Sequence, residues 1–354
     1  MELLSVTMND GVKPRSEIEG KDNSSEDKSN YKIVRKGDMV YNSMRMWQGA
    51  NGISPCDGIV SPAYTVLMPK QEINNGYFAA LFKSANLINE FRKNSQGMTS
   101  DTWNLKYPQI ETIKVQIPSV SEQDKVSEMF SVLDERIAAQ SRLVESLKKY
   151  KRGVVSKVFS EIERECSTIR LGDYVSIHRG GSPRPIDAYI TDDTDGINWI
   201  KIGDTSADDL YITRTREKIV PSGAKKSRRV FQGDLILSNS MSFGRPYILQ
   251  IDGCIHDGWL LIRDENNVFE KRFLCYYLGS DNVIAQYKRF AAGSCVNNLN
   301  SELVGNVEIC CPPYRTQQKI ANMLTVLDSR IDHASRTHVA LLRIRTSLLQ
   351  QLFI

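Results

Sequence analysis

The stretch Val132-Leu133-Asp134-Glu135-Arg136-Ile137 decides the fold, because a close copy of it recurs as Val326-Leu327-Asp328-Ser329-Arg330-Ile331. The two stretches lie 194 residues apart, counted from Val132 to Val326. Further pairs match at the same offset: Pro118 with Pro312, Gln123 with Gln317, Lys125 with Lys319, and Val126 with Ile320. This period is far longer than the roughly 20–50 residues of a solenoid repeat, so each copy should contain a domain and a connector.

The repeat continues upstream at an offset near 196 residues. Gly37-Asp38-Met39-Val40 matches Gly233-Asp234-Leu235-Ile236, and Asn42-Ser43-Met44 resembles Asn239-Ser240-Met241. The change of two residues in the offset falls in the segment after these matches, where an insertion in a loop costs little. The chain therefore consists of two copies of one unit.

Length and composition describe a globular protein of two domains. The chain has 354 residues, of which 41% are hydrophobic and 25% are charged, and its formal net charge is +4. These values exclude a disordered or collagen-like chain. No run approaches the roughly 18 apolar residues of a membrane-spanning helix, and the N-terminus lacks the basic region of a secretory signal. We therefore expect a cytoplasmic protein without membrane association, in which nucleic-acid binding would depend on local basic clusters.

The cysteines and histidines argue against metal sites and disulfides. The cysteines are Cys56, Cys166, Cys254, Cys275, Cys295, Cys310 and Cys311. They are odd in number and form no C-x-x-C motif, so we expect buried thiols in a reducing compartment. The four histidines are dispersed. The sequence also lacks the glycine-rich phosphate-binding and dinucleotide-binding motifs, so we expect no cofactor.

Two long helices should follow the matched prolines. Apolar residues recur with 4-3 spacing over more than four heptads in each copy, which is typical of a coiled-coil seam. The first seam consists of Val126, Phe130, Leu133, Ile137, Gln140, Val144, Leu147, Lys151, Val154 and Val158. The second consists of Ile320, Leu324, Leu327, Ile331, Ala334, His338, Leu341, Arg345, Leu348 and Leu352. Ser119-Val120-Ser121-Glu122 predicts a capping box at the start of the first helix, and Pro312-Pro313 marks the second start.

Two arrangements of these helices are open. The matched helices most simply pack on each other, antiparallel if the domains lie at opposite ends. Alternatively, each helix packs only on its own globular domain. Lys151 and Arg345 are polar positions within the two seams, and they mark either the helix register or contacts with partners.

The globular parts should contain short strands and helices. Strands are predicted at 199–202, 234–237 and 258–262, because Gly and Asp bound these apolar runs. Helical spacing covers 76–93 and 270–289. The second of these carries an aromatic stripe that favours a place in the core over a platform for stacking bases. The stripe consists of Phe273, Tyr276, Tyr277, Ile284 and Tyr287.

A variable globular unit that ends in a Pro-x-x-x-x-Gln helix start and a long helix, twice over, resembles the specificity subunit of type I restriction–modification enzymes. The resemblance covers nearly the whole chain and depends on the order and duplication of several motifs. These are Ile117-Pro118-Ser119-Val120-Ser121-Glu122-Gln123, Cys311-Pro312-Pro313-Tyr314-Arg315-Thr316-Gln317, Leu171-Gly172-Asp173-Tyr174, Arg179-Gly180-Gly181-Ser182-Pro183, the two Gly-Asp stretches, and Gly293-Ser294-Cys295-Val296-Asn297-Asn298-Leu299.

The resemblance implies a non-catalytic DNA reader of the α+β class. Two mixed α/β target recognition domains, at 1–117 and 166–311, would each read one half of a split, asymmetric site on double-stranded DNA. Two long helices, at 118–165 and 312–354, would join and space the domains as an antiparallel coiled coil with pseudo-twofold symmetry. The helices would also dock two methyltransferase subunits, and restriction subunits would complete the complex.

The first domain departs from this pattern at its start. At an offset of 196, Met1 corresponds to Ile197, so this copy lacks a counterpart of residues 171–196. We therefore expect a first domain that is shortened at its N-terminus. Either the chain is a fragment or a restarted reading frame, or the lacking strand comes from elsewhere. Reading of a half-site by this domain should be impaired.

Basic clusters give the first set of candidate DNA contacts. The run Lys225, Lys226, Ser227, Arg228 and Arg229 follows a Pro-Ser-Gly turn, which favours an exposed position. Phosphate contact and an ordinary solvated charge run are both open for it. Arg179, Ser182 and Arg184 belong to a basic loop whose two glycines suit close approach of a DNA backbone.

Polar residues after the Gly-Asp strands give the second set. Asn239 and Ser240 either read base edges or satisfy backbone groups in a turn. In the first copy the analogous place holds Asn42, Ser43, Arg45 and Trp47.

Two other functions remain open: a scaffold whose paired helices organise partner proteins, and a stand-alone DNA-binding regulator. Cys311-Pro312-Pro313-Tyr314 is similar to the Pro-Pro-aromatic core of adenine methyltransferases, but Cys replaces the polar residue that holds the amino group. Asp10 with Glu26-Asp27-Lys28 imitates a nuclease motif, but it lies in a polar stretch that predicts a loop. We expect neither motif to be catalytic.

Overall fold

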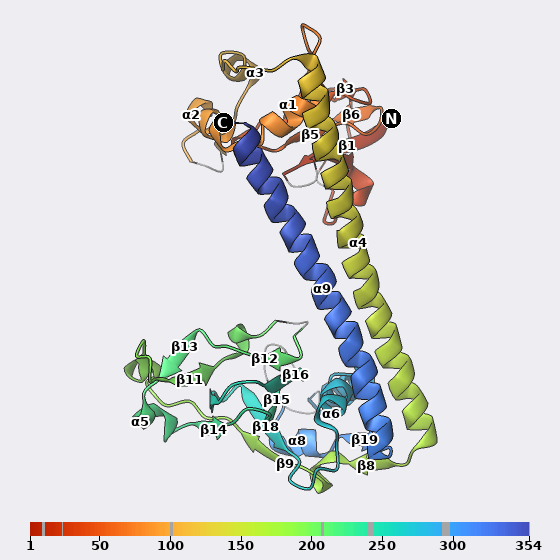
Figure 1. The fold of residues 1–354 in the computed structure, drawn as a ribbon, viewed down its shortest axis with the longest axis vertical. Helices are drawn as coiled ribbons and strands as arrows, with labels where there is room; N and C mark the ends of the chain where they lie inside the picture. Colours follow the sequence, from red (N-terminus) through yellow and green to blue (C-terminus); the bar gives the residue numbers. More distant parts are fainter. Residues whose placement is uncertain are drawn as a thin grey trace. The chain divides into compact units, whose positions relative to one another are not determined.

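The computed structural model describes residues 1–8, 11–22, 24–99, 102–206, 209–239, 244–291 and 298–353. The chain divides into two compact units. Unit 1 contains Met1–Val144 and His333–Ile354, and unit 2 contains Glu145–Asp332. The division cuts the two longest helices, so each unit holds one part of α4 (Val120–Glu165) and one part of α9 (Tyr314–Leu352) (Figure 1).

The predicted capping box begins α4. The Ser119 N–H donates to Glu122 Oε2 at 3.1 Å, and the Glu122 N–H donates to Ser119 Oγ at 3.4 Å. The predicted seam positions of α4 are all buried or half-buried, as are those of α9 up to Leu348. Leu352 differs and is exposed, because Phe353 turns inward instead and its ring stacks on Phe130 at 6.1 Å.

Within each unit the two helices contact each other. In unit 1 the Gln140 Nε2 donates to the carbonyl oxygen of Ala334 at 2.9 Å, and Asp134 forms an ion pair with Arg345. The contact with the higher residue number on α4 has the lower residue number on α9, so the two helices run antiparallel in this unit. In unit 2 Lys151 pairs with Asp328. Each helix also packs on its own globular part; the Phe159 ring of α4, for example, stacks on Tyr277 at 4.5 Å.

Unit 2 contains two five-stranded sheets and a two-stranded ladder. Their strand orders are β10-β13-β11-β17-β14, β12-β16-β15-β18-β9 and β19-β8. The strands are β8 (Thr168–Arg170), β9 (Ser176–Arg179), β10 (Ile190–Thr191), β11 (Ile197–Ile200), β12 (Tyr211–Ile212), β13 (Glu217–Ile219), β14 (Arg228–Val230), β15 (Leu235–Ser238), β16 (Pro246–Leu249), β17 (Gly253–Ile255), β18 (Trp259–Arg263) and β19 (Glu308–Cys310). The helices are α5 (Pro221–Ala224), α6 (Lys271–Leu278), α7 (Asp281–Ala291) and α8 (Ser301–Gly305).

Unit 1 is built from the same parts in smaller number. Its sheets have the orders β2-β1-β6-β3 and β5-β4-β7. The strands are β1 (Glu2–Thr7), β2 (Gly11–Pro14), β3 (Lys32–Val34), β4 (Met39–Asn42), β5 (Asn51–Ile53), β6 (Gly58–Val60) and β7 (Tyr64–Leu67), and the helices are α1 (Asn75–Leu81), α2 (Ala85–Asn94) and α3 (Tyr107–Ile110).

The strand orders confirm the internal repeat. The order β2-β1-β6-β3 repeats as β13-β11-β17-β14, with the parallel pair β1–β6 recurring as β11–β17. The order β5-β4-β7 repeats as β16-β15-β18. Both Gly-Asp stretches form the same turn: Gly37 and Gly233 have φ of 92° and 89°, a region that favours glycine. The carboxylates of Asp38 and Asp234 each accept a backbone N–H three residues upstream.

The core of unit 2 contains the aromatic stripe, as the sequence predicts. Phe273, Tyr276, Tyr277 and Tyr287 are all buried, at 7% exposure or less. Their segment is broken into α6 and α7 at Ser280, and the first-copy segment is broken in the same way at Ser84, which caps α2. The cysteines that the structure describes are free thiols. None of the helices in the described ranges is long and apolar enough to cross a membrane.

Candidate nucleic-acid interface

Four of the predicted residues meet at Asp257, in the turn between β17 and β18. The Ser182 hydroxyl donates to Asp257 Oδ1 at 2.7 Å, and Arg184 donates to Oδ2 at 3.3 Å. The backbone oxygen of Asp257 accepts from Arg179 Nε at 3.2 Å and from Asn239 Nδ2 at 2.8 Å. The pairing of β9 with β18 explains this meeting, because it brings the chain after Arg179 beside the turn before Trp259.

The loop after β9 is held by its own backbone. The Gly180 N–H donates to the Trp259 oxygen at 2.8 Å, and the Gly181 N–H donates to the Ile255 oxygen at 3.1 Å. A Cβ at Gly180 would lie 2.0 Å from the carbonyl oxygen of His256. The lack of a side chain at Gly180 therefore serves packing inside the protein, whereas the sequence suggested a flexible loop for close approach to DNA.

The electrostatics of this turn favour a charged Asp257 and a neutral His256. The hydrogen bond from Ser182 holds the pKa of the Asp257 carboxyl below its ordinary value. Burial lowers the pKa of the His256 imidazole, although the neighbouring Asp257 opposes this shift. The backbone N–H groups of Ile202 and Gly258 face the two ring nitrogens at 3.2 Å and 2.7 Å. A neutral imidazole accepts one such hydrogen bond, whereas the protonated ring accepts none.

The predicted basic run is exposed, and its last two residues lie on an edge strand. Arg228 and Arg229 begin β14, which pairs only with β17 in the described sheet. The Arg228 Nε donates to the carbonyl oxygen of Arg179 at 3.2 Å, which places this side chain beside the Asp257 turn. Lys226 donates to the Tyr189 hydroxyl at 2.6 Å. Lys225 is exposed at the end of α5.

Asn239 lies beneath this surface rather than on it. Its side chain is 2% exposed, its amide nitrogen donates to Asp257, and its backbone N–H donates to the Gly258 oxygen at 2.9 Å. The structure therefore favours the interpretation in which Asn239 satisfies backbone groups and fixes the turn. Ser240 lies outside the described residues.

In unit 1 most of the predicted residues after β4 also make contacts inside the protein. Ser43 is buried and donates to the Ala63 oxygen at 2.6 Å, while Asn42 Oδ1 accepts the Met44 N–H at 3.0 Å. The Trp47 ring packs edge-on against Trp103, with centroids 5.2 Å apart. Arg45 is the exposed member of this set.

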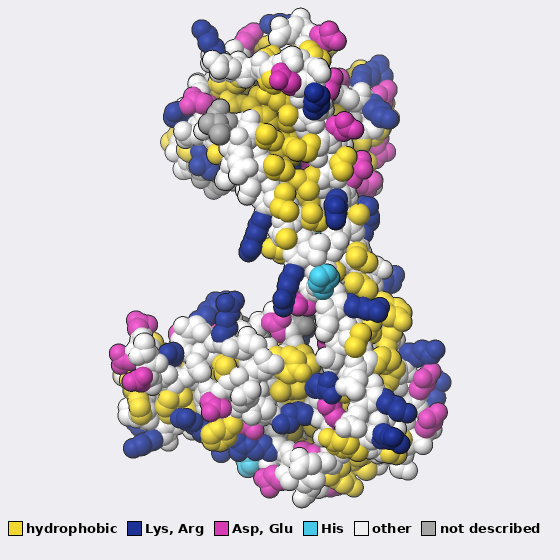
Figure 2. Space-filling model, viewed as in Figure 1, with side chains coloured by type: hydrophobic (Ala, Val, Ile, Leu, Met, Phe, Trp, Pro, Cys, Tyr) yellow, Lys and Arg dark blue, Asp and Glu magenta, His cyan; other side chains and the backbone are white. Residues whose placement is uncertain are grey.

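The exposed cations around the Asp257 turn suit an anionic partner. They are Arg179, Arg184, Lys225, Lys226, Arg228 and Arg229. The side chain of Arg184 is 82% exposed even though it pairs with Asp257. Acidic side chains lie among the basic ones on the visible face (Figure 2), so any nucleic-acid contact would be local. Among the described residues no group of His, Cys, Asp or Glu could hold a metal ion.

Sequence reasoning missed Asp257, which bonds Arg179 and Arg184, and Tyr189, which bonds Lys226. It also missed His256, which lies beside Asp257. An acidic residue and a lone histidine carry no phosphate-binding signal, so a search for basic clusters passes over them. The position of His256 and Asp257 between the apolar runs of β17 and β18 indicates a turn, but the identity of the loop that packs on this turn is not a local property of the sequence.

Comparison with known proteins gives one family for both parts of the chain. The sequence model of a family described as the type I restriction modification DNA specificity domain matches residues 5–149 and again residues 163–340. The first matched segment runs from within β1 to within α4, and the second runs from the end of α4 through β8–β19 into α9.

Curated relatives come from the archaeon Methanocaldococcus jannaschii. The MjaX specificity subunit of a type I restriction enzyme is 22% identical over 273 residues, which are 72% of this chain and 61% of that protein. The type I restriction enzyme MjaVIII specificity subunit is 21% identical over 332 residues, which are 85% of this chain and 74% of that protein. The match to the first relative therefore spans less than two thirds of its length.

Solved structures show the same fold. A chain from work on complex assembly and conformational transition of the type I R-M system aligns with a TM-score of 0.61 at 20% identity, over 93% of this chain and 84% of that one. The S subunit of a type I restriction-modification system from M. genitalium aligns with a TM-score of 0.60 at 16% identity, over 91% of this chain and 84% of that one.

Proposed function

Because the chain belongs to the family of type I restriction modification DNA specificity domains, we propose that it selects the DNA sequence on which a type I methyltransferase and restriction complex acts. The observation that carries this proposal is the double match, to 5–149 and to 163–340. Each matched segment holds one copy of the same strand order. Two readers of one architecture but different sequence suit a split site on double-stranded DNA whose halves differ.

The helices α4 and α9 act in this proposal as an antiparallel coiled coil that spaces the two readers. The 4-3 seams and the contacts between the helices inside each unit support it. A helix of 46 residues is about 69 Å long at about 1.5 Å per residue, enough for readers set one DNA turn of about 34–36 Å apart. The outer faces of the helices dock two methyltransferase subunits, and restriction subunits join that complex in the cytoplasm.

DNA contact in unit 2 centres on the cations around the Asp257 turn. Lys225, Arg229 and Arg184 project charge for phosphate contacts, which set affinity and position. Asp257 holds the loop after β9, and Asn239 holds the turn itself. The chain is non-catalytic in this proposal, and the chemistry belongs to the partner subunits.

The test is to map methylated motifs, by long-read sequencing, in DNA from cells that express this chain with a methyltransferase subunit of the same system. We expect a methylated motif that disappears when the chain is omitted. A split, asymmetric motif supports two working readers, and a motif built from one half places the reading in unit 2. Co-purification with the methyltransferase but no motif supports a scaffold instead. Stable binding to one duplex without any partner supports a stand-alone regulator.

A further inference from the structure

Two of the four tryptophans lie half-buried in unit 1 and touch each other. The rings of Trp47 and Trp103 pack edge-on, with centroids 5.2 Å apart. Trp199 and Trp259, in unit 2, are buried at 2% and 0% exposure. Tryptophan side chains that a domain leaves partly uncovered are enriched where proteins bind partners, because each offers a large and rigid apolar surface. The pair in unit 1 therefore has aromatic surface available for a ligand.

The backbone around the pair is anchored in the core of unit 1. The first residue of the 3-10 turn η2 (Met46–Gln48) and Leu105 are fully buried, at 0% exposure. The Leu105 N–H donates to the Ser43 carbonyl oxygen at 2.8 Å, which brings the chain at Trp103 beside the turn that carries Trp47. The Trp47 indole N–H donates to a carbonyl oxygen three residues upstream, at 3.1 Å. Buried neighbours and this bond thus hold the two rings in place at the surface.

Two arginines lie beside the rings. The Arg92 guanidinium, in the last turn of α2, lies over the Trp47 ring, 5.7 Å from its centroid. Arg92 is exposed, as is Arg45 at the N-cap of η2. A guanidinium over an aromatic ring still presents N–H donors at its rim, and these donors bind phosphate oxygens and the O6 and N7 atoms of guanine. Glu90 on the same helix pairs with Lys93 at 2.7 Å. The aromatic pair therefore lies among cations.

A nearly fully exposed methionine follows α2. Met98 is 98% exposed, although methionine side chains are more often buried. The segment that carries it is closed at its base, where Gln96 and Asn104 exchange backbone hydrogen bonds at 3.0 Å and 2.9 Å. A Cβ at Gly97 would lie 2.6 Å from the carbonyl oxygen of Thr102, so the two sides of the segment approach each other closely. A flexible apolar side chain on such a narrow segment can enter a groove or a base step of DNA.

The positions of the two tryptophans hold different side chains in unit 2. Trp47 corresponds to Phe243 at the offset of 196, and Trp103 corresponds to Asn297 at the offset of 194. Both of these unit 2 residues lie outside the described residues. Two readers of one architecture that select different half-sites have to differ where they touch the bases. The two pairs differ in size and in polarity, as such positions require.

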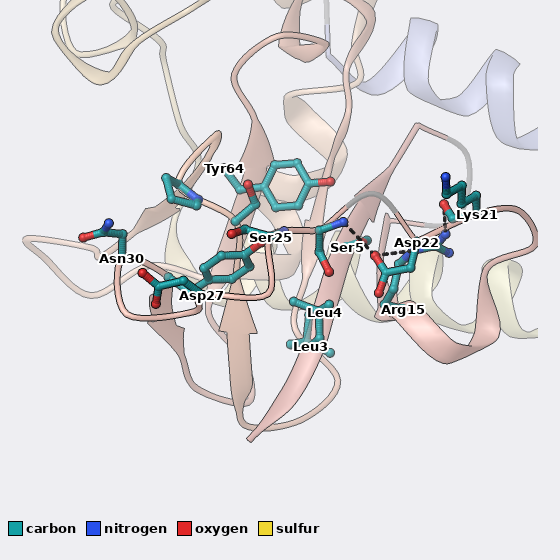
Figure 3. Close-up of a pocket in the computed structure, with 14 residues that line it drawn as sticks. Leu3, Leu4, Ser5, Arg15, Lys21, Asp22, Ser25, Asp27, Asn30 and Tyr64 are labelled. Atoms are coloured by element: carbon teal, nitrogen blue, oxygen red, sulfur yellow. Dashed lines mark hydrogen bonds and ion pairs between the residues drawn. The ribbon is translucent and has the colours of Figure 1, made fainter.

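A cavity of about 650 Å³ lies elsewhere in unit 1. Figure 3 shows Leu4 of β1 and Tyr64 at its wall, together with Arg15 and Asp22, which pair at 3.6 Å. Among the described residues that line it, none belongs to η2, to α2 or to residues 96–105. The tryptophan pair is therefore a separate feature of this unit.

The pair also lies on other elements than those next to β8, β9 and β10 in unit 2. These three strands pair there with β19, β18 and β13. The matching parts of unit 1 are residues 114–116, β7 and β2. The tryptophan pair is built instead on η2, α2 and residues 103–105. Its contacts join residues within 43–105, whatever occupies the places of those three strands.

From these features we infer that Trp47, Trp103, Arg92, Arg45 and Met98 form the surface with which unit 1 touches the bases of its DNA half-site, here called the aromatic site. The inference rests on the proposed function and names residues that determine one half of the selected sequence. The rings pack against base edges and thymine methyl groups, and the arginines bind phosphates or guanine edges. The methionine enters the groove beside them.

The test compares the methylated motifs that this chain produces together with a methyltransferase subunit of the same system. The parent chain is compared with Arg92→Ala, Met98→Ala and Trp103→Ala. Each variant should relax or change one half of a split motif, with methylation at the parent sites reduced by about tenfold or more, and leave the other half unchanged. Arg92 and Met98 are exposed, so their truncation should leave the fold intact even if Trp103→Ala is unstable.

Two control variants are matched to these changes. Lys93→Ala removes the neighbouring exposed cation of α2, so it alters the net charge as Arg92→Ala does. Met68→Ala removes another exposed methionine of unit 1, at 82% exposure, that is not part of the aromatic site. Both controls should leave the two halves of the motif unchanged.

A binding cycle separates base contact from assembly of the complex. Parent and Arg92→Ala complexes are titrated with the cognate duplex and with duplexes in which one half or the other is scrambled. Scrambling the half that unit 1 reads should weaken binding of the parent by about tenfold or more and binding of the variant by about twofold or less. Scrambling the other half should weaken both complexes equally.

Variants that leave both halves of a split parent motif unchanged overturn the inference and leave the proposed function standing. A parent motif with one half only, unchanged by the variants, also overturns it, because unit 1 then reads no bases. Variants that no longer co-purify with the methyltransferase would mean that the aromatic site binds a protein, which overturns it as well. A parent complex that assembles but methylates no motif refutes the proposed function and the inference together.

Discussion

Arg345 on α9 pairs with Asp134 on α4 through two guanidinium nitrogens, and the same pair recurs one repeat away as Lys151 with Asp328. Arg345 lies 194 residues after Lys151, and Asp328 lies 194 residues after Asp134, which is the offset of the sequence repeat. The cation of each helix copy therefore meets the aspartate of the other copy inside each unit. Repeated pairs of this kind fix the register of two antiparallel helices, which is the role that polar seam positions commonly have.

A double-mutant cycle measures the Arg345–Asp134 pair. Arg345→Ala, Asp134→Ala and the double variant are compared by urea unfolding, followed by helical circular dichroism. Asp134 is about half exposed, so we expect a coupling energy of about 0.5–1 kcal/mol that shrinks in high salt. The exposed Lys157–Glu161 pair on α4 is the control and should show less. Equal coupling in the two cycles would contradict a special role for Arg345.

The Pro-x-x-x-x-Gln motif joins each long helix to its globular part. Gln317 accepts the Glu270 N–H at 2.8 Å and donates to the Pro312 oxygen at 2.9 Å, and Gln123 makes the same bonds with Asn74 and Pro118 at 2.9 Å each. Each bonded N–H belongs to the residue that caps the first helix after the sheets, α6 or α1.

Gln317→Ala should therefore destabilise unit 2. Gln317 is 1% exposed, and its removal leaves buried backbone groups without partners, at a cost of about 2 to 4 kcal/mol. The readout is the urea midpoint of the full chain. Gln318→Ala, one position on and exposed, should change it little. A Gln317→Ala variant as stable as Gln318→Ala would refute the assignment of this bond network.

Two adjacent glycines should respond differently to alanine. A Cβ at Gly180 meets the His256 oxygen at 2.0 Å, whereas at Gly181 the nearest atom is 3.6 Å away. Gly180→Ala should cost about 1–3 kcal/mol and displace the loop from Asp257, and Gly181→Ala should be tolerated. Thermal unfolding gives the stability, and exchange at 180–184 reports the loop. Similar behaviour of the two variants would exclude close packing as the reason for Gly180.

His256 should make unit 2 sensitive to mild acid. Burial depresses its pKa in the folded protein, so between that pKa and the ordinary value of 6.5 the unfolded chain binds a proton that the folded chain does not. Stability is then retained above about pH 6.5 and falls as the pH falls below it. The charged side chains that face the ring are Asp257, Lys201 and Asp204.

The measurement is the thermal midpoint between pH 7.5 and 5 for the parent chain, for His256→Gln and for His178→Gln. We expect His256→Gln to flatten the slope and His178→Gln, at an exposed position on β9, to leave it unchanged. Asp257 acts in a separate window. Its depressed pKa adds stability that is lost as the pH falls below the ordinary carboxyl value of 3.8.

The basic surface of unit 2 should contribute affinity without sequence preference. The double variant Lys225→Ala, Arg229→Ala removes two exposed cations. Each phosphate interaction removed in this way should reduce the slope of log K against log salt concentration by about one. The assay is binding of the assembled complex to cognate and unrelated duplexes at several salt concentrations. Lys157→Ala on α4 is the control. A loss of affinity confined to the cognate duplex would mean that these residues read bases.

The sequence by itself determined the repeat, the two long helices, their starts and their covered faces. These are local properties, because a 4-3 apolar period and a capping box act within a few turns of one segment. The strands predicted at 234–237 and 258–262 and the burial of the aromatic stripe follow from composition in the same way. The strand predicted at 199–202 is shifted, because β11 ends at Ile200 and a 3-10 turn follows at Ile202–Asp204. The exposure of the basic run was also predictable, since a charged run after a turn is costly to bury.

Only the tertiary structure decided how the site is assembled. Arg179, Ser182 and Arg184 reach Asp257 across more than seventy residues of chain, through the pairing of β9 with β18. Asn239, which the sequence left open between a base reader and a turn residue, is buried and donates to the same turn. Strand neighbours are chosen by long-range packing and hydrogen bonding, which no local pattern encodes.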